Sequence, residues 1–300
     1  MSRGPERTPY WLYSALVLML VFLVVVVLLP ADGEQKEPEI AVSDPFTGEQ
    51  HQSGLLYEEF QKAPIEASET PPVNHAGTGI ALIMDDVGYD LKALKRVLAL
   101  PFHVAISILP DAPYAEESAK MAHAAGSTVM LHLPMEPSNP KYRARMNGAF
   151  LKADMDEAQI KDHFIQALNR VPHVTGVNNH MGSLLTTLKE PMQWVMQVCK
   201  QRALFFVDSR TAHNSVAATV AADSGVAWAS RRVFLDHTVD DEDLRLAWKS
   251  VLKCAKRKGS CIVIAHPHAE TLNFLEQRVL ESERGSVQPL TTLLHSGGVS

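Results

Sequence analysis

The strongest constraint on the fold is an alternation of short apolar runs with longer segments of helical periodicity, which starts near Gly79. The apolar runs are 80–84, 104–109, 128–133, 176–178, 203–207, 226–229 and 261–265. The helical segments between them are 90–99, 114–125, 155–170, 189–201, 211–224 and 240–258. Strands that alternate with helices of this length form βαβ units around a parallel sheet. We therefore expect an α/β domain over residues 77–290, with its strands in a barrel or an open doubly wound sheet.

Residues 10–30 form a second, different kind of apolar segment, which is almost free of polar residues. Its length matches the roughly 20 residues that a helix needs to span a bilayer. A cleaved signal peptide is the alternative. Signal peptides have a shorter apolar region of about 7–15 residues, followed by a cleavage site with small residues, and this segment is longer and is not followed by such a site. We therefore expect an uncleaved transmembrane anchor.

The charges around this span predict its orientation. Arg3 and Arg7 precede it, within a short tip of residues 1–9, and Asp32 and Glu34 follow it. Because positively charged flanks stay in the cytoplasm, we expect the rest of the chain on the periplasmic side of the inner membrane.

The segment 31–76 is rich in Pro, Glu, Ser and Thr, and it carries more acidic than basic residues. Such a composition buries too little apolar surface to offset the loss of chain entropy, so we expect a linker. Residues 291–300 are expected to form a C-terminal tail.

The charge and the cysteines exclude several classes of function. The formal net charge is −6 and the cations are dispersed, so the basic surface of a nucleic-acid-binding protein is missing. The three cysteines include no Cys-x-x-Cys pair, which argues against a thiolate zinc site. Cys254 and Cys261 are able to pair in an oxidising compartment, but Cys261 lies in an apolar run and is expected to be a buried free thiol.

Polar and titratable residues follow nearly every apolar run, at the strand ends where parallel α/β folds bind ligands. The first run is followed by Asp85 and Asp86. Two adjacent carboxylates are costly unless a cation or a shared proton relieves their repulsion, which suggests a metal site. An N-cap role for Asp86 in the following helix explains that residue equally well.

The later strand ends carry the other candidates, namely His132, the Asn178–Ser183 string, Asp208, Asp236 with His237, and the tripeptide His266-Pro267-His268. This tripeptide suits a metal ion, but its proline equally serves to end the strand. A single histidine at such a position is more often a hydrogen-bonded structural residue than a ligand. The asparagines equally suit a tight turn, and Asp208 equally suits a helix N-cap. The coincidence of these residues at one end of the sheet is what favours a functional site.

The strings IALIMDDVGYD, LHLPMEP, GVNNHMGS and FFVDSRT occur in this order. Together they resemble the divergent polysaccharide deacetylase family, distant relatives of the NodB-type carbohydrate esterases, over roughly residues 77–290. The resemblance implies a distorted (β/α)₇ barrel. It also implies removal of acetyl groups from sugars with the help of one divalent metal ion, which is often zinc.

The resemblance also implies roles for individual residues. Asp85 corresponds to the catalytic base, Asp86 to a metal ligand, and His266 to the general acid. His132 matches the first ligand of a His-x-x-x-His motif, in which Glu136 stands where the second histidine is usual. We complete the metal site with His180.

Several further residues are expected to support this site or to contact the substrate. Asp208 would orient His266 or the substrate. The residues expected to support the ligands or to touch the sugar are Glu136, Asn178, Asn179, Ser183 and Tyr89.

Two functional hypotheses follow from these residues. The first is a zinc-dependent deacetylase that acts on an envelope polysaccharide such as peptidoglycan. The second is a catalytically inactive barrel that binds glycan or an envelope protein, because the second motif is altered. A phosphatase shares the ligand chemistry, but it lacks support from a cluster of Arg or Lys at the strand ends beyond Arg210 and Arg231.

Overall fold

The computed structural model describes residues 77–279 and 281–297. The predicted tip, transmembrane span and linker over residues 1–76 lie outside the described residues. Among the helices that the structure does describe, none is both long and apolar enough to cross a membrane.

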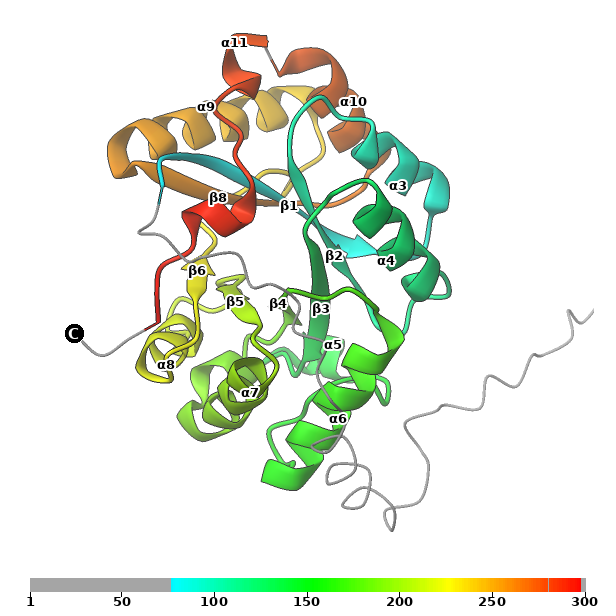
Figure 1. The fold of residues 1–300 in the computed structure, drawn as a ribbon, viewed down its shortest axis with the longest axis vertical. Coiled ribbons are helices and arrows are strands. Elements are labelled where there is room, and N and C mark those ends of the chain that lie inside the picture. Colours follow the sequence, from blue (N-terminus) through cyan, green and yellow to red (C-terminus); the bar gives the residue numbers. More distant parts are fainter. Residues whose placement is uncertain (1–76, 280, 298–300) are drawn as a thin grey trace, which may run out of the picture. The chain divides into compact units, whose positions relative to one another are not determined.

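The described chain alternates strands and helices as the sequence predicts (Figure 1). The strands are β1 (Gly79–Val87), β2 (Val104–Ile108), β3 (Val129–Met135), β4 (Gly176–Met181), β5 (Phe205–Asp208), β6 (Trp228–Ser230), β7 (Val233–Phe234) and β8 (Ser260–Ala265). The longer helices are α3 (Leu91–Leu98), α4 (Ala115–Ala124), α6 (Glu157–Arg170), α7 (Lys189–Gln201), α8 (Ala217–Asp223), α9 (Asp241–Lys258) and α10 (Ala269–Arg278). Shorter elements are α5 (Pro140–Arg143), α11 (Glu281–Arg284), and the 3₁₀ turns η1 (Leu185–Thr187) and η2 (Leu290–Leu293).

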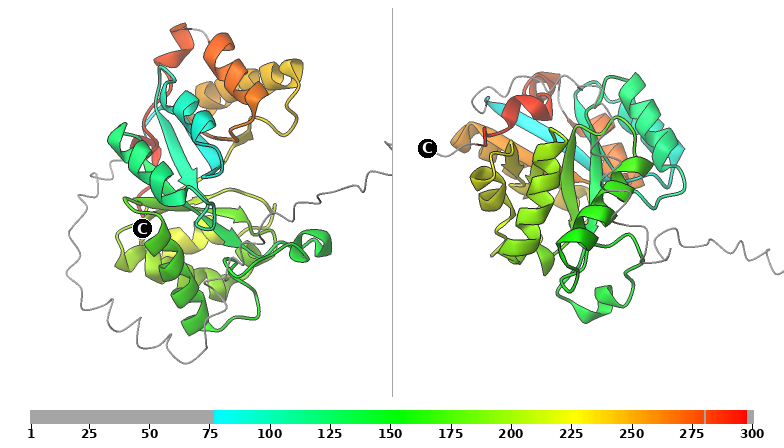
Figure 2. Two further views of the ribbon diagram at one scale, coloured as in Figure 1. Left: turned by 90° about the vertical axis from the view of Figure 1, so that its right-hand side faces the viewer. Right: turned by 60° about the horizontal axis from the view of Figure 1, so that its bottom comes forward.

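All strand pairs in the sheet are parallel, in the order β6-β5-β4-β3-β2-β1-β8-β7. β6 and β7 stand at opposite ends of this order, yet only Arg231 and Arg232 connect them. An extended chain of this length spans at most about 11 Å, so the two edges of the sheet come close together. The sheet is therefore a curled half-barrel with helices outside it, consistent with a (β/α) barrel (Figures 1 and 2). The two-residue strand β7 was not predicted.

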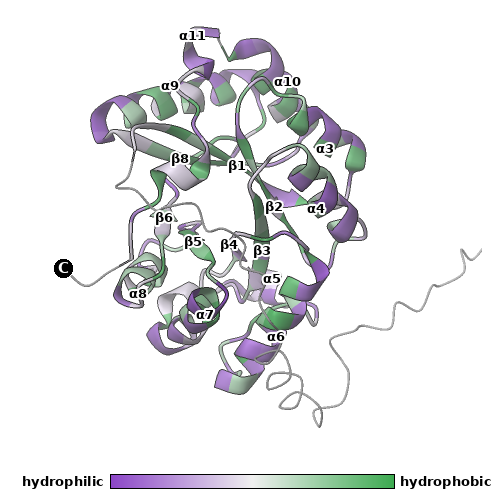
Figure 3. Cartoon of the chain, in the orientation of Figure 1, coloured by the Kyte–Doolittle hydropathy of each residue, from purple (hydrophilic) through white to green (hydrophobic). Residues whose placement is uncertain are grey.

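The two faces of the sheet follow the alternation of side chains along each strand. In β1, Ile80, Leu82 and Met84 belong to the large apolar cluster between the sheet and the helices. Ala81 and Ile83 point the other way, into a smaller apolar cluster inside the curl. In Figure 3 the strands are largely hydrophobic, and the helices mix hydrophobic and hydrophilic residues.

The C-terminal segment fills the inside of the curl near the amino ends of the strands. Leu290, Leu293 and Leu294 are buried in the inner cluster beside Phe205 and Ile262. A parallel bridge joins Ile80 to Val287, and an antiparallel bridge joins Trp228 to His295. The chain thus packs against the sheet beyond the predicted boundary at residue 290.

A disulfide joins Cys254 of α9 to Cys261 of β8, with a Cα–Cα distance of 5.7 Å. The expectation of a free thiol at Cys261 is therefore wrong. The two cysteines meet because the chain reverses its direction in a tight turn between α9 and β8. Gly259 lies in this turn, and its φ of 79° is a left-handed conformation that glycine adopts without strain. Cys199 is the free cysteine and is buried.

Candidate active site at the carboxyl ends of the strands

Polar side chains occupy the last inward-facing position of most strands. In β1, Asp85 follows the inward residues Ala81 and Ile83, and in β8 the next inward position after Ile264 is His266. Every second residue of a strand faces inward, so the inward positions at the carboxyl ends of the other strands can be read in the same way. They are Ser107 of β2, His132 of β3, Asn178 and His180 of β4, Ser209 directly after β5 and Arg231 directly after β6. These residues face one region because the strands are parallel and their carboxyl ends coincide.

Asp85 and Asp86 face this region together because β1 is irregular at its end. The pairing register between β1 and β2 shifts between Met84 and Val87, and Asp86 has a left-handed backbone with φ of 55°. Two consecutive residues of a regular strand point to opposite faces, so this irregularity is what turns the second carboxylate inward. The N-cap of α3 is Asp90, whose carboxylate accepts hydrogen bonds from the backbone of Lys92 and Ala93, so the capping alternative for Asp86 is wrong.

The structure brings Asp86, His132 and His180 together from three strands. The His180 Nδ1 atom lies 2.9 Å from Asp86 Oδ1, and His132 Nε2 lies 3.2 Å from the same oxygen. The two imidazole rings are 4.9 Å apart and nearly perpendicular. One ligand atom from each of the three residues lies within 4.8 Å of the other two.

Asn178 connects His132 to Asp85 through a buried hydrogen-bond network. Its Nδ2 atom donates to the Asp85 carboxylate at 2.8 Å and 3.1 Å, which makes Oδ1 the acceptor. Oδ1 accepts from His132 Nδ1 at 2.9 Å and from Ser107 Oγ at 2.5 Å. Because Asn178 Oδ1 can only accept, His132 Nδ1 carries a proton, and the other ring nitrogen, Nε2, faces Asp86.

The two aspartates give this region a strong negative potential. Burial disfavours protonation of His132, but the charges of Asp85 and Asp86 outweigh it and raise the pKa of His132 to about 9. Burial disfavours ionisation of Asp86, yet hydrogen bonds and charge from His132 and His180 hold its pKa well below the ordinary value. The negative potential of the two carboxylates thus favours the positively charged form of His132, and it would equally favour a metal cation.

His266 lies on the opposite side of Asp86 and is paired with Asp236. Its Nε2 atom is 3.8 Å from Asp86 Oδ2, and its Nδ1 atom is 3.1 Å from Asp236 Oδ1. Asp236 Oδ2 accepts hydrogen bonds from the His266 backbone at 2.6 Å and from Thr271 Oγ1 at 2.9 Å. Burial opposes protonation of His266, but the hydrogen bond and charge of Asp236 raise its pKa above the ordinary value.

Asp236, and not Asp208, is the carboxylate that bonds His266, so the expectation that Asp208 orients this histidine is wrong. That Asp208 orients the substrate stays a prediction. Asp208 is fully buried on the outer side of β5, where its carboxylate accepts from Arg210 N at 2.8 Å and Ser215 Oγ at 2.9 Å. Burial, partly offset by these hydrogen bonds, raises its pKa. The physical reason is the strand alternation, which turns position 208 away from the interior and position 209 toward it.

Several other predicted residues lie beside the site and stabilise its loops. Glu136 accepts from Ala153 N at 2.7 Å, so its carboxylate is held by the segment after α5. Asn179 accepts from Ser209 N at 2.9 Å and donates to Met181 O at 2.7 Å. Ser183 Oγ accepts from Ser138 N at 2.9 Å.

Tyr89 lies at the exposed edge of the site, with 54% of its surface accessible. Burial of its hydroxyl, together with the charges of Asp111 and Asp86, raises its pKa. The phenol therefore lies within electrostatic reach of the acidic centre while its ring faces solvent.

Ser107 is a site residue that the sequence did not indicate, and Asp236 and Arg231 were noted only as residues at strand ends, without a role in the site. Arg231 donates from Nε to Ser209 O at 2.6 Å and from Nη2 to Arg210 O at 2.8 Å, and thereby fixes the loop after β5. The alternation of side chains along the strands could have identified Ser107 and Arg231. Each lies two residues after an inward-facing alanine, Ala105 or Ala229, and therefore faces inward as well.

The three residues Asp86, His132 and His180 fit a divalent metal ion. They supply one carboxylate oxygen and two imidazole nitrogens, a donor set typical of a catalytic zinc site. The Nδ1–H of His132 donates a hydrogen bond to Asn178 Oδ1, and this bond orients the ring as in other metal-binding histidines. Glu136 is not part of this donor set.

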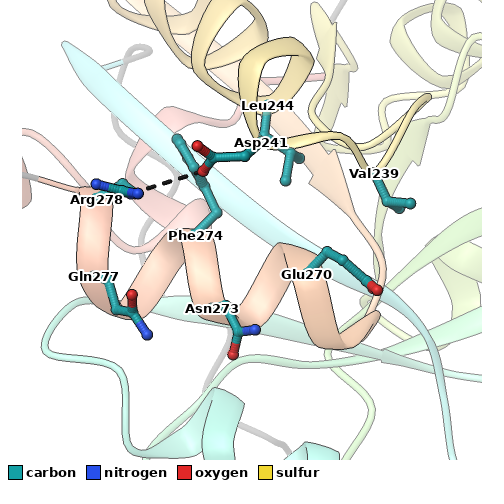
Figure 4. A pocket seen from close by; sticks show the side chains of 8 residues that line it. All are labelled: Val239, Asp241, Leu244, Glu270, Asn273, Phe274, Gln277 and Arg278. Atoms are coloured by element: carbon teal, nitrogen blue, oxygen red, sulfur yellow. Dashed lines mark ion pairs between the residues drawn. The ribbon is translucent and has the colours of Figure 1, made fainter.

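A hollow lies between α9 and α10, and none of these residues lines it (Figure 4). Val239, Leu244 and Phe274 line it, and an ion pair of 3.7 Å joins Arg278 to Asp241 beside them. It contains none of the predicted catalytic or metal-binding residues, so the strand-end cluster is the candidate active site.

The parallel half-barrel is consistent with a (β/α) barrel, and it carries a candidate Asp-His-His metal site and an Asp-His pair at the carboxyl ends of its strands. Residues 82–293 match the family described as divergent polysaccharide deacetylase, and the chain belongs to this family.

Two relatives support this assignment. The chain is 38% identical over 200 residues to the uncharacterized protein YibQ of Escherichia coli K12, which covers 67% of this chain and 62% of YibQ. It is 34% identical over 201 residues to an uncharacterized protein of Haemophilus influenzae, which covers 67% of this chain and 71% of that protein. The matched region thus spans less than two thirds of YibQ.

The fold resembles the crystal structure of the uncharacterized protein ATU2773 from Agrobacterium tumefaciens C58, with a TM-score of 0.66 and 18% identity. This similarity covers 73% of the present chain and 89% of that protein. At this level of identity it shows a shared fold.

Proposed function

We propose that the chain is a metal-dependent deacetylase that hydrolyses acetyl groups on an envelope polysaccharide. The observation that carries this proposal is the convergence of Asp86, His132 and His180 beside the independently oriented pair of His266 and Asp236. The family supports a carbohydrate substrate and deacetylase-like chemistry.

Asp86, His132 and His180 would hold the metal ion, with zinc as the expected metal. A divalent cation bound there supplies Lewis-acid activation of a carbonyl group and of a water molecule. The role of the chain is to hold the three donor atoms in place. Asn178 contributes by fixing His132 through Nδ1 and Asp85 through its carboxylate.

Asp85 and His266 would move the protons of the hydrolysis. Asp85 is buried and receives two contacts from Asn178, so its carboxylate is fixed as a base for the attacking water. Asp236 binds His266 at Nδ1 and leaves Nε2 directed toward Asp86. The protonated His266 can then donate its Nε2 proton to the leaving amine or alkoxide.

The proposed location on the periplasmic side of the inner membrane rests on the sequence and on the disulfide. The apolar span over residues 10–30 predicts an anchor, and its flanking charges predict the orientation. The Cys254–Cys261 disulfide is of the kind that persists in oxidising compartments such as the periplasm. A tethered hydrolase in that compartment would meet peptidoglycan, and the exposed Tyr89 ring is suited to stacking on a sugar.

Release of acetate tests this function. The purified full-length chain is incubated with chitooligosaccharides and with acetylated peptidoglycan fragments, and acetate is measured enzymatically. We expect release that stops after chelation of metal and returns with zinc. Asp86→Asn should lower the rate more than about 100-fold, because even residues that only support a metal ligand contribute about 10–100-fold.

Asp90→Asn is the matched control, since it lies four positions away and asparagine also caps a helix well. It should keep its activity. Glycan binding without acetate release from either substrate would favour the inactive barrel, and equal activity of the Asp86→Asn and Asp90→Asn chains would contradict the proposed metal site.

A further inference from the structure

Asp236, His266 and His268 form a second group of metal-type donors, next to the first. One ligand atom of each lies within 4.8 Å of the other two. Asp236 is buried, and its Oδ2 atom is occupied by the His266 backbone and by Thr271. The other oxygen, Oδ1, is therefore held in a fixed direction, toward His266 Nδ1 at 3.1 Å.

His268 completes this group from the exposed side. The segment turns tightly at Pro267, with the His268 N–H donating to His266 O at 2.8 Å, and the two rings lie 5.8 Å apart. His268 is exposed, so a cation from solvent reaches the group without passing the first site. One carboxylate and two imidazoles are again a donor set that suits zinc.

Local charge favours a cation here in spite of the nearby helix end. His268 is the N-cap residue of α10, whose amino terminus carries about half a positive charge. Asp236 contributes a full negative charge, and Asp86 Oδ2 lies only 3.8 Å from His266 Nε2. The carboxylates therefore outweigh the helix dipole.

We propose that Asp236, His266 and His268 bind a second transition-metal ion such as Zn²⁺, more weakly than the first site, and that this ion inhibits hydrolysis. Binding is weaker because the exposed side chain of His268 must be ordered, whereas His132 of the first site is buried and already oriented by Asn178. The cation replaces the Asp236–His266 hydrogen bond and releases the Nδ1 proton to solvent. An imidazole bound to metal through Nδ1 no longer forms the imidazolium that donates a proton from Nε2. The inhibition rests on the proposed deacetylase function, whereas the binding does not.

Metal binding to the full-length chain tests the site without any substrate. The metal-free protein is dialysed against increasing concentrations of Zn²⁺, and bound zinc is measured by elemental analysis. We expect two zinc ions for each chain, the second with lower affinity. His268→Gln should bind one ion, and His237→Gln should bind two, because His237 is an equally exposed histidine directly after Asp236 but is absent from the group.

A wild-type chain that binds one zinc ion, or a His268→Gln chain that still binds two, would overturn the second site. Loss of the same ion in His237→Gln would overturn it as well, since binding would then be an unspecific property of exposed histidines.

Acetate release tests the inhibition separately. Activity of the wild-type chain should rise with the first zinc equivalent and fall several-fold as the second one binds, while the His268→Gln chain should show the rise alone. If His268→Gln is inhibited as strongly as the wild type, the inhibitory role is wrong. If no chain releases acetate, the deacetylase proposal fails, and the zinc stoichiometry still decides whether the second site exists.

Discussion

At the amino ends of the strands, the interior of the curled sheet is filled by apolar side chains such as Ile83, Phe205 and Ile262, with Leu290 and Leu293 packed against them. At the carboxyl ends, one or two inward positions later along the same strands, the interior holds Asp85, His132, Asn178 and His266. Both regions use the same alternation of side chains, and most of these residues are buried.

The difference lies in how each region satisfies its buried groups. The apolar end needs shape and volume, and its residues contribute mainly to the free energy of folding. The polar end needs a partner for every donor and charge, and Asn178 alone contacts Ser107, His132 and Asp85. We therefore expect substitutions at the polar end to change metal binding and catalysis, and substitutions at the apolar end to change stability.

The largest expected effect is on the rate at the polar end. His266→Gln should lower the rate of acetate release by roughly 10²–10⁴-fold, because a general acid contributes about this much to proton transfer. The zinc bound at Asp86, His132 and His180 should remain, as elemental analysis at low zinc concentration can measure. Loss of this first zinc in His266→Gln would show that the two groups are one centre.

At the apolar end, Ile83→Ala should lower the free energy of unfolding by about 2–5 kcal/mol, the usual cost of a cavity in a well-packed core. Ile83 is completely buried and lies two residues before Asp85. Urea unfolding measures the loss, and zinc affinity is measured on the folded protein. If Ile83→Ala kept the stability of the wild-type chain but bound zinc more weakly, the two ends would not differ in the way described.

Asn178→Ala should lower zinc affinity by about 10–100-fold, because the residue orients a ligand without binding the metal itself. Ser107→Ala should have a smaller effect, since it removes one contact to Asn178 and leaves those to His132 and Asp85 in place. Competition with a colorimetric chelator measures both affinities. Equal losses in the two variants would contradict the central position of Asn178.

The smallest expected effect is a shift in pH dependence. Asp236 raises the pKa of His266 through a hydrogen bond and its charge, so the acid form of His266 persists to higher pH. Asp236→Asn removes the charge and should lower that pKa. The alkaline limb of kcat/KM against pH should therefore move to lower pH, whereas an unchanged limb would mean that His266 is not the acid.

The alternation of strands and helices was readable from the sequence because buried strands are short and continuous in their apolar character. Most predicted runs became strands within a few residues of the expected bounds, such as 261–265 for β8 (Ser260–Ala265). β7 was missed because Val233 and Phe234 form a strand only through their pairing with β8. α10 (Ala269–Arg278), which directly follows the His266-Pro267-His268 string, was not predicted.

The residues at the strand ends were predictable as a set, but their partners were not. Asp208 ends β5, Asp236 follows β7 by two residues, and both are buried, so their local sequences do not distinguish them. The distinction depends on which face of the sheet each carboxylate meets and on the connection between β7 and α9. In the same way, the disulfide could not be predicted from the local sequence, because it depends on how the turn between α9 and β8 brings Cys254 and Cys261 together.

Anomalous X-ray diffraction from crystals of the zinc-bound chain, recorded on both sides of the zinc absorption edge, tests the central claim most directly. The account predicts a strong peak about 2.0–2.2 Å from one carboxylate oxygen of Asp86, from His132 Nε2 and from a ring nitrogen of His180. Zinc bound elsewhere, with these three side chains uncoordinated, would contradict it.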